Sequence, residues 1–537
     1  MFILYRIGIL LDSLTIQAWQ VEAIRKLLST GLVEFSVLVV NQSPKPSGRP
    51  SPFLYRVYRK LDRIFFKDDL DAFESVPLSK VISSKVPVLS TKPIQTKYRD
   101  SFSDKDIEKI ASYDLDIVIR FGFRILSGEI LKVPKLGVWS YHHGDPKVYR
   151  GGPPAFWEVM KQIPATGCVL MRLNEKLDKG EILYESHTQT DPLSVQRNAN
   201  RIFWASAAFP ARVVREIDRL GMAGWCLNVA SKAIDFSAPL LKPPQTRSML
   251  RMGTNLFLRN LKRKTREQFK APHWDIGWIS DLSINRRLIS TRGAQLIKRE
   301  DGNKYYLADP FPIFYQGRLW VFVEQFDKKR KKGIIAIMDE EGNCAPVIEE
   351  EWHLSYPFVW EENGAFWMLP ESAEAGKLWL YQAISFPFKW ERKQELFSEE
   401  AYDPTLWKTE QGYWLYVNQK SHPACSPFDE LSLYFSKSLS QPSWQSHSRN
   451  PIVSDVRSSR PAGSLFEENG KFYRPAQDSE KRYGHRIRVM EVKSLSLDSY
   501  REEEAYRIEP NEKEGTLGIH TMNRIGDRRI FDFYSRK

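Results

Sequence analysis

The chain has 537 residues, of which 42% are hydrophobic and 27% are charged, and its formal net charge is +13. This composition is ordinary for a globular protein, and the length suits roughly two to four domains. No apolar run reaches the roughly 18–20 residues of a membrane-spanning helix. The four cysteines stand apart without CxxC spacing, which argues against a structural zinc site or a disulfide framework. The first residues have no basic region or cleavage site of a secretory signal, and we expect a cytoplasmic protein.

The first 130 residues alternate strand and helix patterns. Apolar runs predict buried strands over residues 3–11, 35–40 and 115–122, and helical spacing predicts a helix over 17–29. Ser103 stands where an N-cap would begin a helix that includes residues 107–110. Such alternation favours a parallel α/β sheet, in which sites lie beyond the carboxyl ends of the strands. We predict one α/β domain over residues 1–240.

The most informative stretch follows the third of these strands. Residues 123–126 read FRIL, residues 136–152 read LGVWSYHHGDPKVYRGG, and residues 177–183 read LDKGEIL. This ordered series resembles the formyltransferase superfamily, which includes methionyl-tRNA, glycinamide-ribonucleotide and sugar N-formyltransferases. The resemblance covers residues 80–215 and implies a Rossmann-like domain that uses 10-formyltetrahydrofolate as its cofactor.

The resemblance also implies the catalytic positions. The family's Asn falls on Ser140, its His on His142 and its Asp on Asp178. When an amine attacks a formyl carbon, an imidazole can meet the oxyanion and a carboxylate can accept the amine proton. We therefore expect His142 to stabilise the oxyanion or act as general acid, and Asp178 to act as general base and orient the ring. The cofactor-binding residues that the resemblance implies are Phe121, Gly122, Arg124, Ile125, Leu126, Tyr149, Arg150 and Gly151.

Two departures from the family pattern affect this site. Ser140 replaces the Asn, and residues 144–147 (GDPK) replace a folate-contacting segment of the Ser-Leu-Leu-Pro type. Loss of one oxyanion donor can lower a rate by about 10²–10³. Either Ser140 substitutes for the carboxamide, or a neighbour such as His143 does, or the domain has lost the family's activity. A purely structural His142 and a turn-forming Asp178 are the simpler alternatives.

A basic linker is predicted over residues 241–272. Between Lys242 and Lys270 there are nine basic residues and one acidic residue, Glu267, and apolar residues lie among the charges. Such a segment can be a solvated linker helix, or it can contact an anionic membrane surface, nucleic acid or an acidic substrate. We expect a linker helix, with peripheral contact to the inner membrane face as the main alternative and no specific nucleic-acid partner.

The C-terminal half repeats a proline motif at an interval near 50 residues. Its copies are residues 308–311 (ADPF), 355–358 (SYPF), 402–405 (YDPT) and 460–463 (RPAG), with a degenerate fifth copy at 518–521 (GIHT). A turn and an aromatic strand follow each copy, which is typical of β-propeller blades. We predict a five-bladed β-propeller over residues 273–537, with an irregular β-sandwich as the alternative. The half also resembles the domain that precedes the glycosyltransferase part of plant glucosamine inositolphosphorylceramide transferases.

The propeller has a candidate site of its own. The motifs resemble five-bladed glycosidases, in which acidic residues at blade starts converge on the axis, and this points to Asp309, Glu371 and Asp403, with His520 as a polar neighbour. An Asp-Pro pair is also an ordinary turn device, so glycan binding, glycan hydrolysis and a structural role remain open. No metal site is predicted.

The favoured function is formyl transfer from 10-formyltetrahydrofolate to an amine, with an amino sugar on a nucleotide or glycan carrier as the acceptor that the propeller recognises. The alternative is a glycan-binding or glycan-active propeller protein whose N-terminal domain is a degenerate scaffold. A third hypothesis is a glycan-binding protein without enzymatic activity. The sequence does not specify an oligomeric state.

Overall fold

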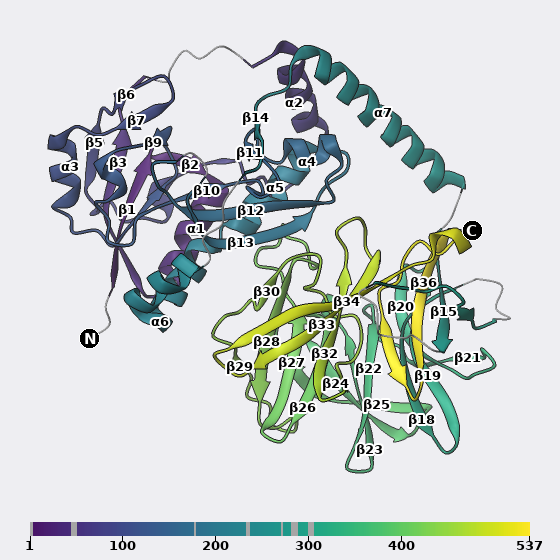
Figure 1. Ribbon diagram of the computed structural model, residues 1–537. Helices are drawn as coiled ribbons and strands as arrows, with labels where there is room; N and C mark the ends of the chain where they lie inside the picture. The colour runs from purple at the N-terminus through teal and green to yellow at the C-terminus, as the bar shows by residue number, and fades with distance from the viewer. Residues whose placement is uncertain are drawn as a thin grey trace. The chain divides into compact units, whose positions relative to one another are not determined.

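The computed structural model describes residues 4–44, 51–176, 179–231, 237–269, 272–280, 288–298 and 305–536. It divides into two compact units, Met1–Asn260 with Ser421–Cys425, and Leu261–Lys420 with Ser426–Lys537. The first unit is α/β and the second consists almost entirely of strands (Figure 1). No helix in the described ranges is both long and apolar enough to cross a membrane.

A seven-stranded sheet forms the centre of the first unit, in the order β13-β12-β10-β8-β1-β3-β5. The five strands from β10 to β5 run parallel to one another, whereas β12 and β13 pair antiparallel at one edge. The predicted Rossmann-like sheet is confirmed, with an antiparallel edge that the sequence pattern did not reveal. The strands are β1 (Tyr5–Leu11), β3 (Val33–Asn41), β5 (Val88–Thr91), β8 (Ile117–Arg120), β10 (Val138–His142), β12 (Ala165–Arg172) and β13 (Glu181–Gln189).

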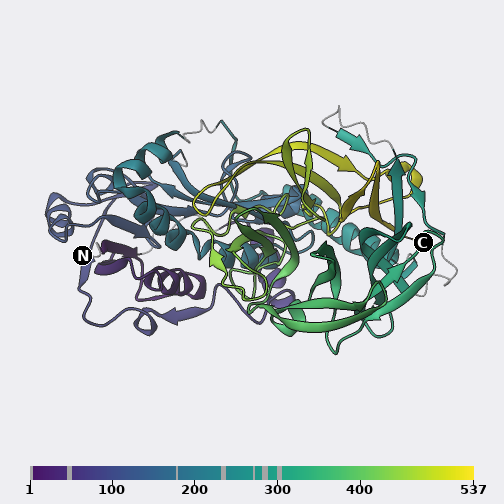
Figure 2. The same cartoon turned by 90° about the horizontal axis from the view of Figure 1, so that it is seen from below.

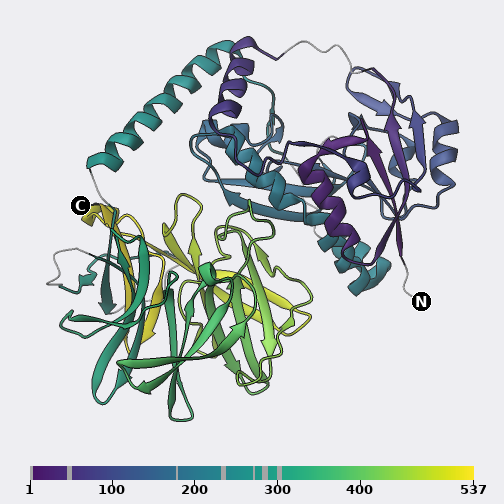
Figure 3. The same ribbon diagram turned by 180° about the vertical axis from the view of Figure 1, so that it is seen from behind.

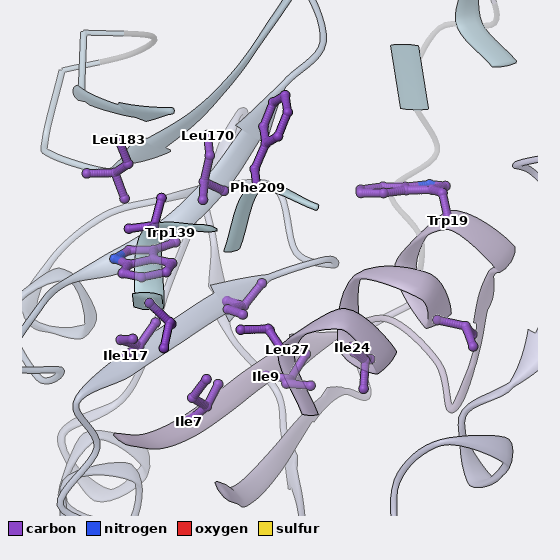
Figure 4. Packing of buried hydrophobic residues seen from close by; sticks show 14 of the residues in the cluster. Ile7, Ile9, Trp19, Ile24, Leu27, Ile117, Trp139, Leu170, Leu183 and Phe209 are labelled. Carbon is purple, nitrogen blue, oxygen red and sulfur yellow. The ribbon is translucent and has the colours of Figure 1, made fainter. Parts of the chain in front are cut away.

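Helices cover both faces of this sheet because its strands are apolar on both faces. One face packs against α1 (Ala18–Leu28), α5 (Val195–Ser206) and α6 (Phe209–Ser231), and Figure 4 shows Ile24 and Leu27 of α1 close to Ile7 and Ile9 of β1. The other face packs against α3 (Asp104–Ala111). Helix α3 begins as the sequence predicts, since the Ser103 hydroxyl accepts a hydrogen bond from the Asp106 backbone N–H.

Smaller elements complete the first unit. The remaining helices are α2 (Phe53–Phe65), α4 (Phe156–Lys161) and α7 (Thr246–Phe269), with short 3₁₀ turns η1 (Leu78–Lys80) and η2 (Glu129–Leu131). The remaining strands are β2 (Thr15–Gln17), β4 (Ser75–Pro77), β6 (Ile94–Gln95), β7 (Arg99–Ser101), β9 (Ile125–Leu126), β11 (Arg150–Gly151) and β14 (Leu240–Leu241). The predicted basic linker is thus mostly the helix α7, which continues past the end of the first unit at Asn260.

Residues 272–536, where the structure describes them, form five sheets that follow one another along the chain as propeller blades. Blade I contains β18 (Tyr305–Tyr315), β19 (Arg318–Asp327), β20 (Lys332–Met338) and β21 (Cys344–Ile348). Blade II contains β22 (Ser355–Glu362), β23 (Ala365–Glu371), β24 (Leu378–Ser385) and β25 (Lys389–Phe397). Blade III contains β26 (Tyr402–Thr409), β27 (Gly412–Asn418), β28 (Glu430–Ser436), β29 (Gln445–Ser446) and β30 (Val453–Ser454). The 3₁₀ turns η3 (Ala373–Ala375) and η4 (Glu512–Glu514) lie between strands.

The last two blades use strands from both ends of the domain. Blade IV contains β31 (Phe466–Glu468), β32 (Lys471–Asp478), β33 (Arg486–Leu495), β34 (Tyr500–Glu509) and β16 (Leu288–Ser290), and blade V contains β35 (Met522–Ile525), β36 (Arg528–Arg536), β15 (Pro272–Ser280) and β17 (Gln295–Leu296). Strand β15 pairs with β36 over its whole length, from Pro272 opposite Arg536 to Ser280 opposite Arg528 (Figures 1 and 2). This pairing closes the ring, and the predicted five-bladed propeller is confirmed.

The repeated proline motif is a bulge in the first strand of blades I, II and III. The strand register shifts between Ala308 and Phe311 in blade I and at the equivalent positions of blades II and III. At the centre of each bulge the backbone φ is positive, at 52° for Asp309, 46° for Tyr356 and 46° for Asp403. L-residues rarely adopt this conformation, and a bulge re-aims the side chain it carries. The three side chains are buried and meet residues of other blades, as described below.

Candidate functional site

The predicted catalytic strand is β10, which ends at His142 in the middle of the sheet. Ser140 and His142 lie on one face of this strand because side chains alternate, and Tyr141 and His143 lie on the opposite face. A Cβ atom placed on Gly144 would lie 3.3 Å from His142 Nε2 and 3.2 Å from Tyr149 Oη. The His142 ring is therefore enclosed by the loop that follows its own strand. Asp178, its predicted partner, lies outside the described residues.

Ser140 is buried and receives hydrogen bonds from a cation. Arg120, at the end of β8, donates from Nε and Nη2 to Ser140 Oγ at 2.9 and 2.8 Å. Its Nη1 donates to the carbonyl oxygens of Phe123 and Arg124 at 3.2 and 2.7 Å. At the position of the family's Asn, the Ser140 hydroxyl therefore accepts hydrogen bonds from the Arg120 guanidinium group. The sequence analysis did not predict a role for Arg120, because only the pairing of β8 with β10 brings it beside Ser140.

A cavity of about 260 Å³ opens at this end of the sheet. Aromatic side chains dominate its lining, which consists of Gln17, Trp19, Gln20, Arg120, Phe121, Gly122, Phe123, Ser140, Tyr141, His143 and Phe203. The Tyr141 hydroxyl is buried and has no hydrogen-bond partner among the described residues, and burial raises its pKa well above the ordinary value. Gly122 must be a glycine here, since a Cβ atom would lie 2.3 Å from the Asp12 backbone nitrogen. Of the predicted cofactor-binding residues, Phe121 and Gly122 line this cavity.

The other predicted cofactor-binding residues support the surrounding loops. Arg124 forms an ion pair with the buried Asp100 at 2.6 Å, and Arg150 donates to the carbonyl oxygen of Ala238 at 2.9 Å. The remaining members are Ile125 and Leu126 in β9, where Leu126 is buried, and Gly151 in β11, where a Cβ atom would lie 2.4 Å from the Leu241 carbonyl oxygen.

Tyr149 belongs to a buried pair that the sequence analysis did not predict. Its hydroxyl donates to Glu158 Oε1 at 2.7 Å, and both residues are only 2% exposed. Burial raises the pKa of Glu158 to about 7. A carboxyl group that holds its proton near neutral pH therefore lies next to the loop that encloses His142.

His143, the predicted substitute donor, lines the cavity, but its ring is held by other partners. Its ring stacks on Phe203 with centroids 3.5 Å apart, and its Nε2 forms a hydrogen bond with Ser206 Oγ at 3.1 Å. Burial, with a contribution from His142, lowers its pKa to about 3, so the ring stays neutral. In the loop that follows, Asp145 pairs with His187 at 3.2 Å, and this partner lowers the pKa of Asp145 although burial opposes the shift.

The propeller brings all four of its predicted site residues together near the axis. The Asp309 carboxylate accepts hydrogen bonds from Thr521 Oγ1 at 2.6 Å and from the Tyr356 backbone N–H at 3.2 Å. His520 lies 3.4 Å from Asp309 through Nε2 and 2.5 Å from Asp532 through Nδ1. Burial lowers the pKa of His520, but the two carboxylates outweigh it and raise the value to about 9. The imidazole is thus a cation held between two acids.

A second group lies across the axis. Arg460 donates to both oxygens of Asp403, and its Nη2 also reaches Glu371 Oε2 at 3.4 Å. Gln477 Nε2 donates to Asp403 at 2.8 Å, and the Asp403 backbone N–H donates to Glu371 Oε2 at 3.0 Å. Burial and the neighbouring Asp403 carboxylate raise the pKa of Glu371 well above its ordinary value.

Between these groups lies a second cavity of about 270 Å³. Charged groups and aromatic rings line it together: Trp274, Tyr306, Ala308, Asp309, Glu324, Phe326, His353, Ser355, Glu371, Arg460, Tyr483 and His520. Burial raises the pKa of Glu324 to about 8 and that of Asp309 to about 6, with further contributions from nearby carboxylates. The sequence analysis missed Glu324 and Asp532, which lie outside the repeated motif, and Arg460, which stands in the position before the proline but is a base rather than an acid.

The cluster of Asp309, His520 and Asp532 has ligand atoms within 4.8 Å of one another, a spacing that a metal ion would fit. Although burial lowers the pKa of His520, Asp532 and Asp309 raise it to about 9, so in this structure the two carboxylates form ion pairs with a charged imidazole.

Comparisons with known proteins agree with the two-unit division. The Formyl transferase family model matches residues 74–202, and the model named Glucosamine inositolphosphorylceramide transferase 1, N-terminal, matches residues 294–522. The chain combines these two kinds of domain. The formyl transferase domain therefore contains the His142 site, and the second domain contains the axial cavity of the propeller.

Relatives match one domain each. Glucosamine inositolphosphorylceramide transferase 1 of Arabidopsis thaliana is 34% identical over 218 residues, which are 39% of this chain and 28% of that protein. Methionyl-tRNA formyltransferase of Prochlorococcus marinus (strain MIT 9312) is 40% identical over 95 residues, which are 18% of this chain and 29% of that protein. The chain thus spans less than a third of the length of each of these relatives. Among solved structures, glycinamide ribonucleotide transformylase 1 from Symbiobacterium toebii is 15% identical, covers 39% of this chain and 86% of its own, and has a TM-score of 0.28.

Proposed function

We propose that the formyl transferase domain transfers a formyl group from 10-formyltetrahydrofolate to the amine of an amino sugar. The observation that carries this proposal is the end of β10, where Ser140 and its partner Arg120 line the aromatic cavity and His142 lies on the same face of the strand as Ser140. The match of residues 74–202 to the Formyl transferase family supports the reaction class. The amino sugar is suggested by the pairing with a domain whose relatives are named for glucosamine.

The residues of the cavity fit the proposed cofactor. Trp19, Phe121 and Tyr141 offer aromatic faces to a planar ring, and the Tyr141 hydroxyl is a polar group without a partner among the described residues. When bound, the folate would supply an activated formyl group. Phe121, Gly122 and Tyr141 would then orient its ring system at the edge of the sheet.

The proposed roles of the polar residues follow from their charges. His142 donates a hydrogen bond to the formyl oxygen as negative charge develops there. Arg120 places a positive charge in the position of the family's Asn, held by Ser140 Oγ and two carbonyl oxygens. Asp178, from the sequence motif, accepts the proton of the attacking amine. In this proposal Arg120, rather than His143, compensates for the missing carboxamide.

The propeller supports the acceptor half of the proposal. Its axial cavity has aromatic surfaces at Trp274, Tyr306 and Phe326, and its carboxyl groups at Glu324 and Glu371 suit the hydroxyl and amine groups of an amino sugar. We propose that this cavity binds the glycan part of the acceptor.

A second candidate function is glycan hydrolysis at the propeller axis. The observation in its favour is that acids of different protonation line one cavity: Glu371, whose pKa lies well above its ordinary value, and Asp309, whose pKa is about 6. A protonated acid and an ionised one flanking a glycosidic bond are what that reaction needs. The formyl transferase domain would then act as a scaffold.

One titration distinguishes the two candidates. A stable 10-formyltetrahydrofolate analogue is titrated into the purified full chain and into His142→Ala and Asp178→Asn. In a separate assay with 10-formyltetrahydrofolate as the donor, amino sugars are screened for formylated product by mass spectrometry. Saturable binding by the wild type and product that disappears in both variants support formyl transfer. No binding at millimolar analogue, together with sugar cleavage that Glu371→Gln abolishes, favours the propeller as the active domain.

A further inference from the structure

The outward face of α7 carries large apolar side chains. Leu250, Phe257, Leu258 and Leu261 are 59%, 65%, 53% and 51% exposed. The last three follow Leu250 by seven, eight and eleven residues, which places all four along one face of the helix. The opposite face carries Met249 and Leu256, which are 4% and 9% exposed, so the helix presents one apolar face to its own domain and a second to the surroundings.

The neighbouring helix α2 has the same unusual construction. Its exposed apolar residues follow helical spacing and are Phe53, Val57, Leu61, Ile64 and Phe65, with exposed fractions of 65%, 37%, 47%, 62% and 73%. Its inner face is anchored, because the buried Asp62 accepts hydrogen bonds from Ser194 Oγ and from the Gln196 backbone N–H, both at 2.8 Å. The exposed face is therefore a fixed surface of a folded domain.

Both helices pack on one hydrophobic cluster around α4. The cluster includes Phe156 and Met249, with Leu54 and Tyr58 of α2 packed against it, and Arg259 of α7 donates to the Val159 carbonyl oxygen at 2.9 Å. Figures 1 and 3 show α2 beside the first turns of α7 from opposite sides. The two apolar faces thus belong to adjacent helices of the first unit, and α7 continues past the end of that unit at Asn260.

Cations border both apolar faces, and the described side chains of these faces include no acid. On α2 the exposed basic residues are Arg56, Lys60 and Arg63; on α7 they are Arg247, Arg251, Lys262, Arg263 and Lys264. Beyond the end of α2, Lys67 is followed by Asp68 and Asp69. The sole acidic residue of α2 is the buried Asp62. Exposed Phe and Leu side chains flanked by Lys and Arg are the pattern of helices that lie in the interface of an anionic membrane.

We propose that α2 and α7 together form a docking surface for an anionic lipid bilayer. The apolar side chains would enter the boundary between headgroups and acyl chains, and the cations would pair with lipid phosphates and carboxylates. Charge complementarity selects this occupant, since a purely apolar protein partner would not need a border of cations. The inference rests on these helices alone and is independent of the proposed reaction.

The test measures co-sedimentation of the purified full chain with vesicles. Vesicles of phosphatidylcholine alone are compared with an equal mixture of phosphatidylcholine and phosphatidylserine, at low and high salt. We expect at least about tenfold stronger binding to the mixed vesicles, weakened by salt. We also expect Phe257→Ser/Leu261→Ser on α7 and Leu61→Ser/Ile64→Ser on α2 each to weaken binding by about tenfold or more.

Matched controls isolate the surface. Leu227→Ser/Ile94→Ser removes two apolar side chains that are 75% and 57% exposed elsewhere in the same domain, and should leave binding unchanged. Lys262→Glu/Lys264→Glu should abolish the preference for phosphatidylserine, whereas Lys105→Glu/Lys109→Glu on α3 makes the same change of charge without effect.

Three results would overturn the proposal. The first is no binding to the mixed vesicles by a wild-type chain whose thermal unfolding is normal. The second is binding that neither double-serine variant weakens. The third is self-association in light scattering that Phe257→Ser/Leu261→Ser abolishes, which would make the surface an interface between copies of this chain.

Discussion

At the carboxyl ends of β8 and β10, Arg120 reaches Ser140 across 20 residues of chain, whereas at the propeller axis Thr521 reaches Asp309 across 212. The first site is displayed on the ends of neighbouring strands and continues into loops. The second is enclosed by side chains from several blades, of which blade I contributes the most. The comparison teaches two points. A site formed by one short motif can lose a side chain while its domain stays folded. A site whose side chains connect several blades also stabilises the propeller.

The largest expected effect tests the structural role of the axis. Arg460→Met leaves the buried Asp403 and Glu371 without their cation, and breaking a buried pair in this way costs about 3–5 kcal/mol. Thermal unfolding should show a large fall in the transition of the propeller. The control Arg330→Met removes an exposed pair with Glu349 and should leave the transition nearly unchanged, because solvent screens such a pair. Equal effects of the two variants would show that the axial network does not stabilise the ring.

At the N-terminal site we expect a substitution to lower activity strongly and to change stability little. His142→Ala should lower formyl transfer by about 10²–10³, or about 3–4 kcal/mol of transition-state stabilisation, because a donor to the developing negative charge is lost. The melting temperature should change little, as the ring lies at the end of a strand. Turnover is measured with saturating donor and amino sugar. Unchanged turnover in a folded variant would remove His142 from the mechanism.

The buried Glu158 predicts a pH dependence of stability in the formyl transferase domain. Its pKa is raised from 4.5 to about 7, so between these values the folded domain holds a proton that the unfolded chain releases. The resulting stability is fully present below pH 4.5 and is lost as the pH rises through 7. Glu158→Gln should therefore stabilise the domain at pH 8, by at most about 3 kcal/mol, and should have little effect at pH 4.5.

The measurement is the melting temperature of the wild type and of Glu158→Gln across this pH range. Glu108→Gln on the exposed face of α3 is the matched control, and it should show no such pH-dependent gain. A gain of equal size at pH 4.5 and pH 8 would contradict the raised pKa of Glu158. In the folded domain the amide replaces an uncharged carboxyl group at pH 4.5 and a buried carboxylate at pH 8, so only the second replacement should increase stability.

The smallest expected effect concerns Ser140. Ser140→Asn restores the family residue and keeps an oxygen that can accept from Arg120, so we expect turnover to change by less than about tenfold. Ser140→Ala removes that acceptor and should lower turnover more than Ser140→Asn does. The two variants are compared by turnover at saturating donor. Abolished turnover in Ser140→Asn would show that Arg120 needs the smaller hydroxyl.

The sequence alone predicted the features that repeat or that lie close together in the chain. The β-α alternation predicted the parallel strands, the motif around His142 predicted the likeness to the Formyl transferase family, and the proline repeat predicted the five blades. Each of these features depends on the spacing of residues within one element or one motif. Apolar periodicity and turn residues are local in the sequence, so the sequence alone shows them. The positions of Asp309 and Asp403 followed from the same repeat.

Only the tertiary structure decided which distant groups meet. The sequence pattern did not show that β12 and β13 run antiparallel, that Arg120 fixes Ser140, or that Arg460 from the start of blade IV neutralises Asp403 of blade III. Nor did it reveal the exposed apolar face of α2. The spacing of apolar residues along a helix is the same whether that face packs against a core or is exposed to solvent. Strand pairing and burial depend on contacts between residues far apart in the chain, and no local pattern encodes those contacts.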